Sequence, residues 1–170
     1  MIDYRSPWMD DELEMFRDAA KRFIESEIVP NDARWRDQHH VDRDIWNKAG
    51  EVGLLCTDIP AEYGGVGGDA RHEAVVAEEM GRHGISSFGH VVHSILAHYV
   101  LNYGSEQQKR NWLPRMASGE LVGAIAMTEP GAGSDLQSVK TSAVKKGDKY
   151  VINGAKTFIT NGWNCDLVIV

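Results

Sequence analysis

The 170-residue chain is poor in cysteine, in long apolar runs and in targeting signals. Its two cysteines, Cys56 and Cys165, stand far apart and outside any CxxC or Cys/His cluster. We therefore expect two free, buried or half-buried thiols in a reducing compartment, rather than a disulfide or a zinc site. No stretch approaches the roughly 18 apolar residues of a membrane span. The N-terminus shows neither a secretory signal nor a transit peptide, so a cytoplasmic protein is predicted.

The chain also has no excess of positive charge. The sequence holds 18 Lys and Arg against 25 Asp and Glu, which gives a formal net charge of −7. This balance excludes a general basic surface for nucleic acid, but it is compatible with a local cationic pocket for a phosphate-bearing ligand. With a hydrophobic fraction of 42%, the chain suffices for one complete domain plus part of a second.

Helical spacing of apolar residues dominates the first two thirds of the chain. Residues 10–29 carry apolar side chains on one face behind an acidic start, and Pro30 predicts a bend or break. The pair Ser105 and Gln108 has the form of a capping box. Further helices are predicted over residues 42–53, 69–84, 88–102 and 105–116.

Strand patterns replace helical ones after Ser118 and Gly119. Residues 121–127 form an apolar run of strand length, and a hairpin is expected around the turn at 147–148. A second hairpin is expected to pair residues 150–152 with 156–160, and another strand starts near Asp166. Helices first and strands second predict an α+β fold, with an all-α domain over 1–120 and a β domain over 121–170.

The sequence stops inside the apolar residues 167–170. One interpretation is a strand that completes a sheet. The other is a truncated β domain, because about 50 residues make only a few short strands, which are marginal alone.

Three histidines, His90, His93 and His98, lie on one predicted helix. The first two are spaced i, i+3, which brings imidazoles together. No acidic ligand accompanies them, and the HExxH pattern is absent. Solvated or hydrogen-bonded histidines are therefore expected, here and at His39 and His40, and no metal site is predicted.

The most informative stretch is Met127–Asp135, which reads Met-Thr-Glu-Pro-Gly-Ala-Gly-Ser-Asp. Its glycines allow close backbone approach to a ligand, and successive N–H groups of such a loop can hold an anion. It is not a Walker A loop, because no Gly-Lys-Ser/Thr follows. It is not a Rossmann fingerprint either, because Leu136 takes the third glycine position. As a glycine loop alone, it fits an ordinary turn.

As a nine-residue string, the same stretch resembles the signature of the acyl-CoA dehydrogenase family. The resemblance continues through residues 147–156 and 158–162, and upstream through 60–65 and 103–108. It covers nearly the whole chain and is closest to the long-chain or bacterial fatty-acid-oxidation branch. It implies a helical N-terminal domain followed by the first strands of an incomplete β-barrel-like middle domain, with the C-terminal helical bundle missing.

The resemblance also implies FAD and a set of site residues. Backbone amides near Thr128 and its hydroxyl would bond the pyrimidine edge of the flavin. Thr160 would lie near N5, and Phe158 would pack on the ring where relatives often have Trp. No catalytic residue is assigned, because the base glutamate is expected beyond residue 170. The implied cofactor-binding residues are Met127, Thr128, Glu129, Phe158, Ile159 and Thr160, and the implied substrate-binding residues are Gly133 and Ser134.

The activity implied is the oxidation of acyl-CoA thioesters to trans-2-enoyl-CoA in fatty-acid β-oxidation. Electrons would pass to an electron-transferring flavoprotein, and the complete protein would be a homo-oligomer, a tetramer or dimer, in the cytoplasm or in the mitochondrial matrix of a eukaryote. The 170 residues alone are expected to be inactive. Two alternatives remain: a non-catalytic helical binding or assembly module, and an acyl-CoA oxidase or flavin monooxygenase relative.

Overall fold

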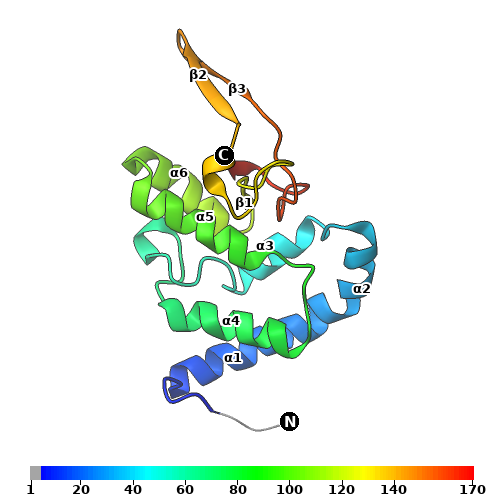
Figure 1. Ribbon diagram of the computed structural model, residues 1–170. Helices are drawn as coiled ribbons and strands as arrows, with labels where there is room; N and C mark the ends of the chain where they lie inside the picture. The colour runs from blue at the N-terminus through cyan, green and yellow to red at the C-terminus, as the bar shows by residue number, and fades with distance from the viewer. Residues whose placement is uncertain (1–4) are drawn as a thin grey trace.

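The computed structural model describes residues 5–170 (Figure 1). Helices come first and short strands follow, which confirms the predicted α+β order. The helices are α1 (Asp11–Phe23), α2 (Val29–Gln38), α3 (Asp44–Glu51), α4 (Ala70–Arg82), α5 (His90–Tyr103) and α6 (Glu106–Ala117). The strands are β1 (Gly123–Ile125), β2 (Ser142–Lys146), β3 (Lys149–Asn153) and β4 (Leu167–Ile169).

Side chains cap the starts of α1 and α6, and the cap of α6 is the capping box that the sequence predicts. The carboxylate of Asp10 accepts a hydrogen bond from the N–H of Leu13 at the start of α1. At the start of α6, Ser105 Oγ accepts from the N–H of Gln108, and Gln108 Oε1 accepts from the N–H of Ser105. These bonds satisfy N–H groups that have no partner inside a helix.

Of the bend or break expected at Pro30, the structure shows no break. The chain runs from α1 through a π-helical turn, Ile24–Ile28, directly into α2, and Pro30 lies in the first turn of α2. Proline is tolerated there because its missing N–H has no helical partner to lose. The wide turn before it keeps Ile24 and Ile28 completely buried.

Two main clusters of buried side chains hold the helices together. The larger joins α1 to α4 and contains Trp46, whose ring lies 4.6 Å from that of Phe88. The second lies under α5 and α6 and includes Leu96 and Met116. Apolar side chains of β1 and β4 pack against this second cluster, so the strands are anchored to the helical part. Full burial of each such side chain contributes about 1.5–3 kcal/mol.

The strands form two separate pairs. β1 and β4 pair in parallel, although β2 and β3 lie between them in sequence. β2 and β3 form the predicted hairpin around residues 147–148. The second predicted hairpin is wrong, because residues 156–160 form no strand. Phe158 and Asn161 have left-handed backbones (φ 55° and 64°), which a strand does not admit.

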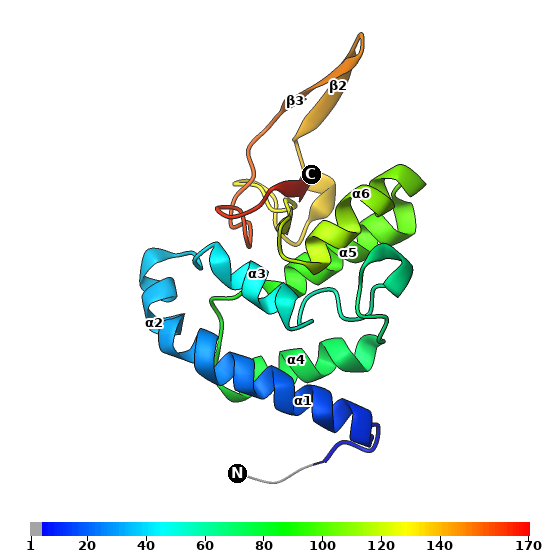
Figure 2. The same ribbon diagram turned by 180° about the vertical axis from the view of Figure 1, so that it is seen from behind.

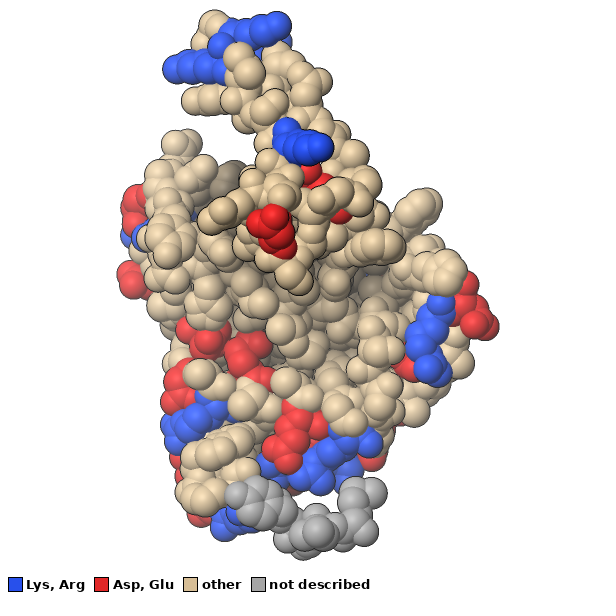
Figure 3. Space-filling view, viewed as in Figure 1, with Lys and Arg blue, Asp and Glu red and all other residues tan. Residues whose placement is uncertain are grey.

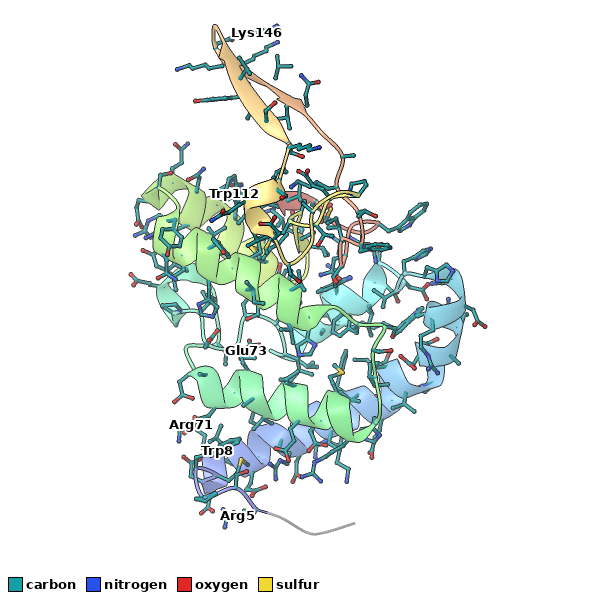
Figure 4. All side chains as sticks on the ribbon, viewed as in Figure 1. Arg5, Trp8, Arg71, Glu73, Trp112 and Lys146 are labelled. Carbon is teal, nitrogen blue, oxygen red and sulfur yellow. The ribbon has the colours of Figure 1, made fainter. Side chains whose placement is uncertain are left out.

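The β2–β3 hairpin projects from the body of the molecule (Figures 1 and 2). Every residue of its two strands is exposed, and Lys146 lies near its tip (Figure 4). Figure 3 shows its basic side chains well apart from the charged groups around α1 and α4. None of the described helices is long and apolar enough to cross a membrane.

Candidate functional site

Two segments, residues 127–129 and 156–160, lie next to each other and contain the cofactor-binding residues that the resemblance implies, 127–129 and 158–160. The ammonium of Lys156 donates a hydrogen bond to the carbonyl of Met127 at 2.8 Å. The N–H of Thr157 donates to the carbonyl of Thr128 at 2.9 Å. The two segments therefore lie side by side at the end of β1, although they belong to no common sheet.

Glu129 is turned inward, toward its own loop. Its carboxylate oxygens accept hydrogen bonds from the N–H groups of Lys140 and Thr141 at 2.8 and 2.9 Å, and Lys156 Nζ lies 3.0 Å away. The adjacent Thr141 side chain, then the Lys140 N–H, lower the pKa of Glu129 to about 2. The side chain of Glu129 thus ties the start of β2 to the site and offers no free oxygen outward.

The other predicted site residues of the two segments are exposed or half-buried. Phe158 is 90% exposed, Thr160 and Met127 are exposed, and Thr128 and Ile159 are half-buried. Among the described residues, nothing accepts a hydrogen bond from the N–H groups of Met127, Thr128 and 158–160, or bonds the hydroxyls of Thr128 and Thr160. Free donors next to an exposed aromatic ring suit a planar ligand with acceptors along one edge.

Gly133 and Ser134 lie on the exposed turn that follows Glu129. This turn is closed by backbone bonds between Glu129 and Ala132, at 2.8 and 3.2 Å. No described contact joins Gly133 or Ser134 to residues 156–160. These two residues are therefore exposed to solvent, and they are not part of the contact between residues 127–129 and 156–160.

Backbone carbonyls from three other parts of the fold hold the second segment in place, and the sequence did not predict these contacts. Asn161 Nδ2 donates to the carbonyls of Gly89 and Gly123. Asn164 Nδ2 donates to the carbonyl of Val41 at 2.8 Å. The only sequence signal is the Asn-Gly pair at 161–162, which predicts the turn but not its partners.

The histidines of α5 take three different roles. His93 is completely buried: its Nδ1 accepts from the N–H of Gly123, and its Nε2 donates to the carbonyl of Met116. Burial lowers the pKa of His93 to about 4. His98 bonds Asp58, as expected of a hydrogen-bonded histidine. His90 departs from the expectation, since it is buried and both ring nitrogens lack a partner among the described residues.

A cavity of about 310 Å³ opens beside Thr160. Its walls come from the end of α2, from residues 86–87 and from residues 159–164. On its rim, the exposed ring of Trp163 stacks on His40 at 5.2 Å, nearly parallel. Among the described residues, no group of three or more His, Cys, Asp or Glu is placed to hold a metal ion.

The chain is similar in sequence to known proteins. Residues 10–120 match the acyl-CoA dehydrogenase N-terminal domain, and residues 124–170 match the acyl-CoA dehydrogenase middle domain. A mitochondrial long-chain specific acyl-CoA dehydrogenase of Sus scrofa is 46% identical over 160 residues, which cover 94% of this chain and 37% of that protein.

Solved structures agree with the sequence comparison. An acyl-CoA dehydrogenase from Geobacillus kaustophilus is 44% identical with a TM-score of 0.92, over 98% of this chain and 44% of its own. One from Bacillus anthracis, complexed with FAD, is 36% identical with a TM-score of 0.88, over 98% of this chain and 29% of its own. The chain thus spans less than half the length of each relative, and it belongs to the acyl-CoA dehydrogenase family.

Proposed function

We propose that the complete protein containing this chain is an FAD-dependent dehydrogenase of acyl-CoA thioesters. It oxidises the bond between the α and β carbons and releases trans-2-enoyl-CoA, a step of fatty-acid β-oxidation. The observation that carries the proposal is the juxtaposition of residues 127–129 and 156–160, with free donors and an exposed ring. The relatives support it, since each is an acyl-CoA dehydrogenase and one is complexed with FAD.

The donors of the first segment suit a flavin. The N–H groups of Met127 and Thr128 and the hydroxyl of Thr128 match the acceptors along the pyrimidine edge. Donors at that edge stabilise the negative charge that collects there on reduction. The Thr160 hydroxyl is available to N5, and Phe158 offers an apolar face for stacking. When bound, FAD supplies the hydride acceptor.

We assign the proton acceptor to a glutamate beyond residue 170. Glu129 is unsuited to that task, because a general base works best with a pKa near the working pH and the pKa of Glu129 is about 2. Its oxygens are also occupied by the N–H groups of Lys140 and Thr141. The chain described here contributes part of the flavin cradle and, through Gly133 and Ser134, part of the wall of the acyl-CoA site.

We also propose an electron acceptor, an oligomeric state and a cellular compartment for the complete protein. An electron-transferring flavoprotein accepts the electrons, the complete protein is a homo-oligomer, and it works in the cytoplasm or, in a eukaryote, in the mitochondrial matrix. Residues 1–170 alone are inactive, since they lack the base. A transfer of electrons to oxygen instead would make the protein an oxidase or a monooxygenase relative.

The test is an anaerobic titration of the purified complete protein with saturated acyl-CoA thioesters of increasing chain length. The visible flavin absorption band is recorded after each addition. We expect a yellow protein whose band bleaches with a saturated thioester and returns with an electron-transferring flavoprotein. A colourless protein, or a band that no saturated acyl-CoA bleaches, contradicts the proposal. Rapid return of the band with oxygen assigns the oxidase alternative.

A further inference from the structure

Asn161 joins the loop of the candidate site to two rigid elements. It follows Thr160 directly and has a left-handed backbone, φ 64°. Its Nδ2 donates to the carbonyl of Gly89 at 2.9 Å and to that of Gly123 at 3.1 Å. Both N–H groups of one amide are therefore used, on partners that lie far from each other in sequence.

The two carbonyls belong to well-held parts of the fold. Gly89 is the residue that caps the start of α5, and Gly123 begins β1. The N–H of Gly123 donates in turn to the buried His93 at 3.0 Å. The side-chain amide of Asn161 thus fixes the loop of residues 158–162 relative to α5 and β1.

The fit around this amide is close. A Cβ atom placed on Gly89 would lie 2.2 Å from Asn161 Oδ1 and 2.6 Å from Thr160 Cγ2. The helix start is therefore in direct contact with the side chain of Thr160 as well as with Asn161. A side chain added at Gly89 would therefore act on Thr160 from the side of α5.

We propose that Asn161 is a positioning residue for the flavin. Its amide sets where Thr160 and the exposed ring of Phe158 stand relative to residues 127–129. Groups that bind a cofactor lose much of their effect when they are misplaced by a fraction of an ångström. The inference rests on the proposed function, since it names what fixes that same site.

Asparagine suits the position for two reasons. Asn adopts the left-handed backbone more readily than other residues that carry a side chain. Its amide also has two N–H donors, one for each carbonyl. Asp has the same shape but donates nothing when ionised, and it would set a carboxylate against two carbonyl oxygens. Gly keeps the backbone conformation and removes the side chain.

These differences define the variants. Asn161→Gly and Asn161→Asp are made in the complete protein, with Asn164→Ala as the matched control. Asn164 also donates a side-chain amide hydrogen bond to a backbone carbonyl, that of Val41 in the loop between α2 and α3, and it is not next to Thr160 in sequence. Gly89→Ala leaves the side chain of Asn161 intact and presses on both Asn161 and Thr160 from the start of α5, so it serves as a second variant.

The measurements are the dissociation constant of FAD, the flavin absorption spectrum and the reduction midpoint potential of the holoprotein. We expect Asn161→Gly and Asn161→Asp to weaken FAD binding about tenfold or more and to shift the spectrum and the potential. Gly89→Ala should give the same spectral shift. Asn164→Ala should lower the melting temperature and leave the spectrum and potential of the bound flavin unchanged.

Two results overturn the inference. One is a wild-type spectrum and potential in Asn161→Gly and Gly89→Ala. The other is an equal change of the spectrum and potential in Asn164→Ala, because the effect would then come from a general loss of stability. Failure of the proposed function is distinguishable, because the wild-type protein itself then takes up no FAD.

Discussion

Lys156 Nζ lies 3.0 Å from Oε1 of Glu129 and also donates to the carbonyl of Met127. One lysine thus joins the two segments of the candidate site. We expect Lys156→Met to lower the melting temperature by a few degrees and to weaken FAD binding, because Glu129 loses a charged donor. Thermal unfolding and FAD titration of the complete protein measure both effects. Lys146→Met, at the exposed hairpin tip in Figure 4, is the control. Equal behaviour of the two variants contradicts the role given to Lys156.

The ring of Phe158 has no part in the fold. It is 90% exposed and belongs to none of the buried clusters. We expect Phe158→Ala to change the unfolding free energy by no more than about 0.5 kcal/mol, as surface substitutions do. FAD binding should weaken, because an apolar stacking face is lost. A destabilised variant with unchanged FAD affinity would show that the ring packs on the protein instead.

His93 makes stability depend on pH. Burial lowers the pKa of His93 from 6.5 to about 4, so the unfolded state binds more protons than the folded state between these values. The contribution of His93 is therefore complete above pH 6.5 and is lost as the pH falls to about 4, by roughly 3 kcal/mol in all. Urea unfolding at a series of pH values measures this slope.

The matched variant for this slope is His93→Gln. It removes the titrating ring and is expected to be less stable at neutral pH, since the carbonyl of Met116 and the N–H of Gly123 lose good partners. Its stability should fall less steeply between pH 6.5 and about pH 4 than that of the wild type. Parallel curves for the two proteins would assign the pH dependence to other groups.

Two glycines with similar positive φ values should respond differently to alanine. Gly119 and Gly147 both have positive φ, 75° and 65°. A Cβ on Gly119 would lie 2.0 Å from the carbonyl oxygen of Trp46, whereas nothing lies within 4 Å of one on Gly147. Gly147→Ala should cost about 1–2 kcal/mol, the strain alone. Gly119→Ala should cost about 1–3 kcal/mol more, from the clash. Equal unfolding free energies contradict the close packing of Gly119.

Local signals predicted much of the fold. The start of α6 follows from the capping box of Ser105 and Gln108, and the acidic start of residues 10–29 marks the beginning of α1. The β2–β3 hairpin follows from a turn between two short strands. Pro30 does not break the helix, because a proline disrupts a helix interior but not a first turn. The π-helical turn before it places Pro30 in the first turn of α2.

Non-local contacts escaped prediction. The parallel pairing of β1 with β4 and the bonds of Asn161 join residues far apart in sequence, and no pattern within either segment encodes them. Residues 156–160 were expected to form a strand, yet they lie against residues 127–129 through Lys156 and Thr157. The family resemblance implied the residues of the candidate site, and the structure adds how the two segments that contain them are held together.

The central claim is that residues 127–129 and 158–160 form part of a flavin site. The most direct test is a titration of the complete apoprotein with FAD, using the wild type, the double variant Thr128→Val with Thr160→Val, and Ser142→Ala as an exposed control. We predict that the wild type and the control bind equally and that the double variant binds at least about tenfold more weakly, because two donors are lost. Equal binding by all three proteins, or no binding by the wild type, would contradict the claim.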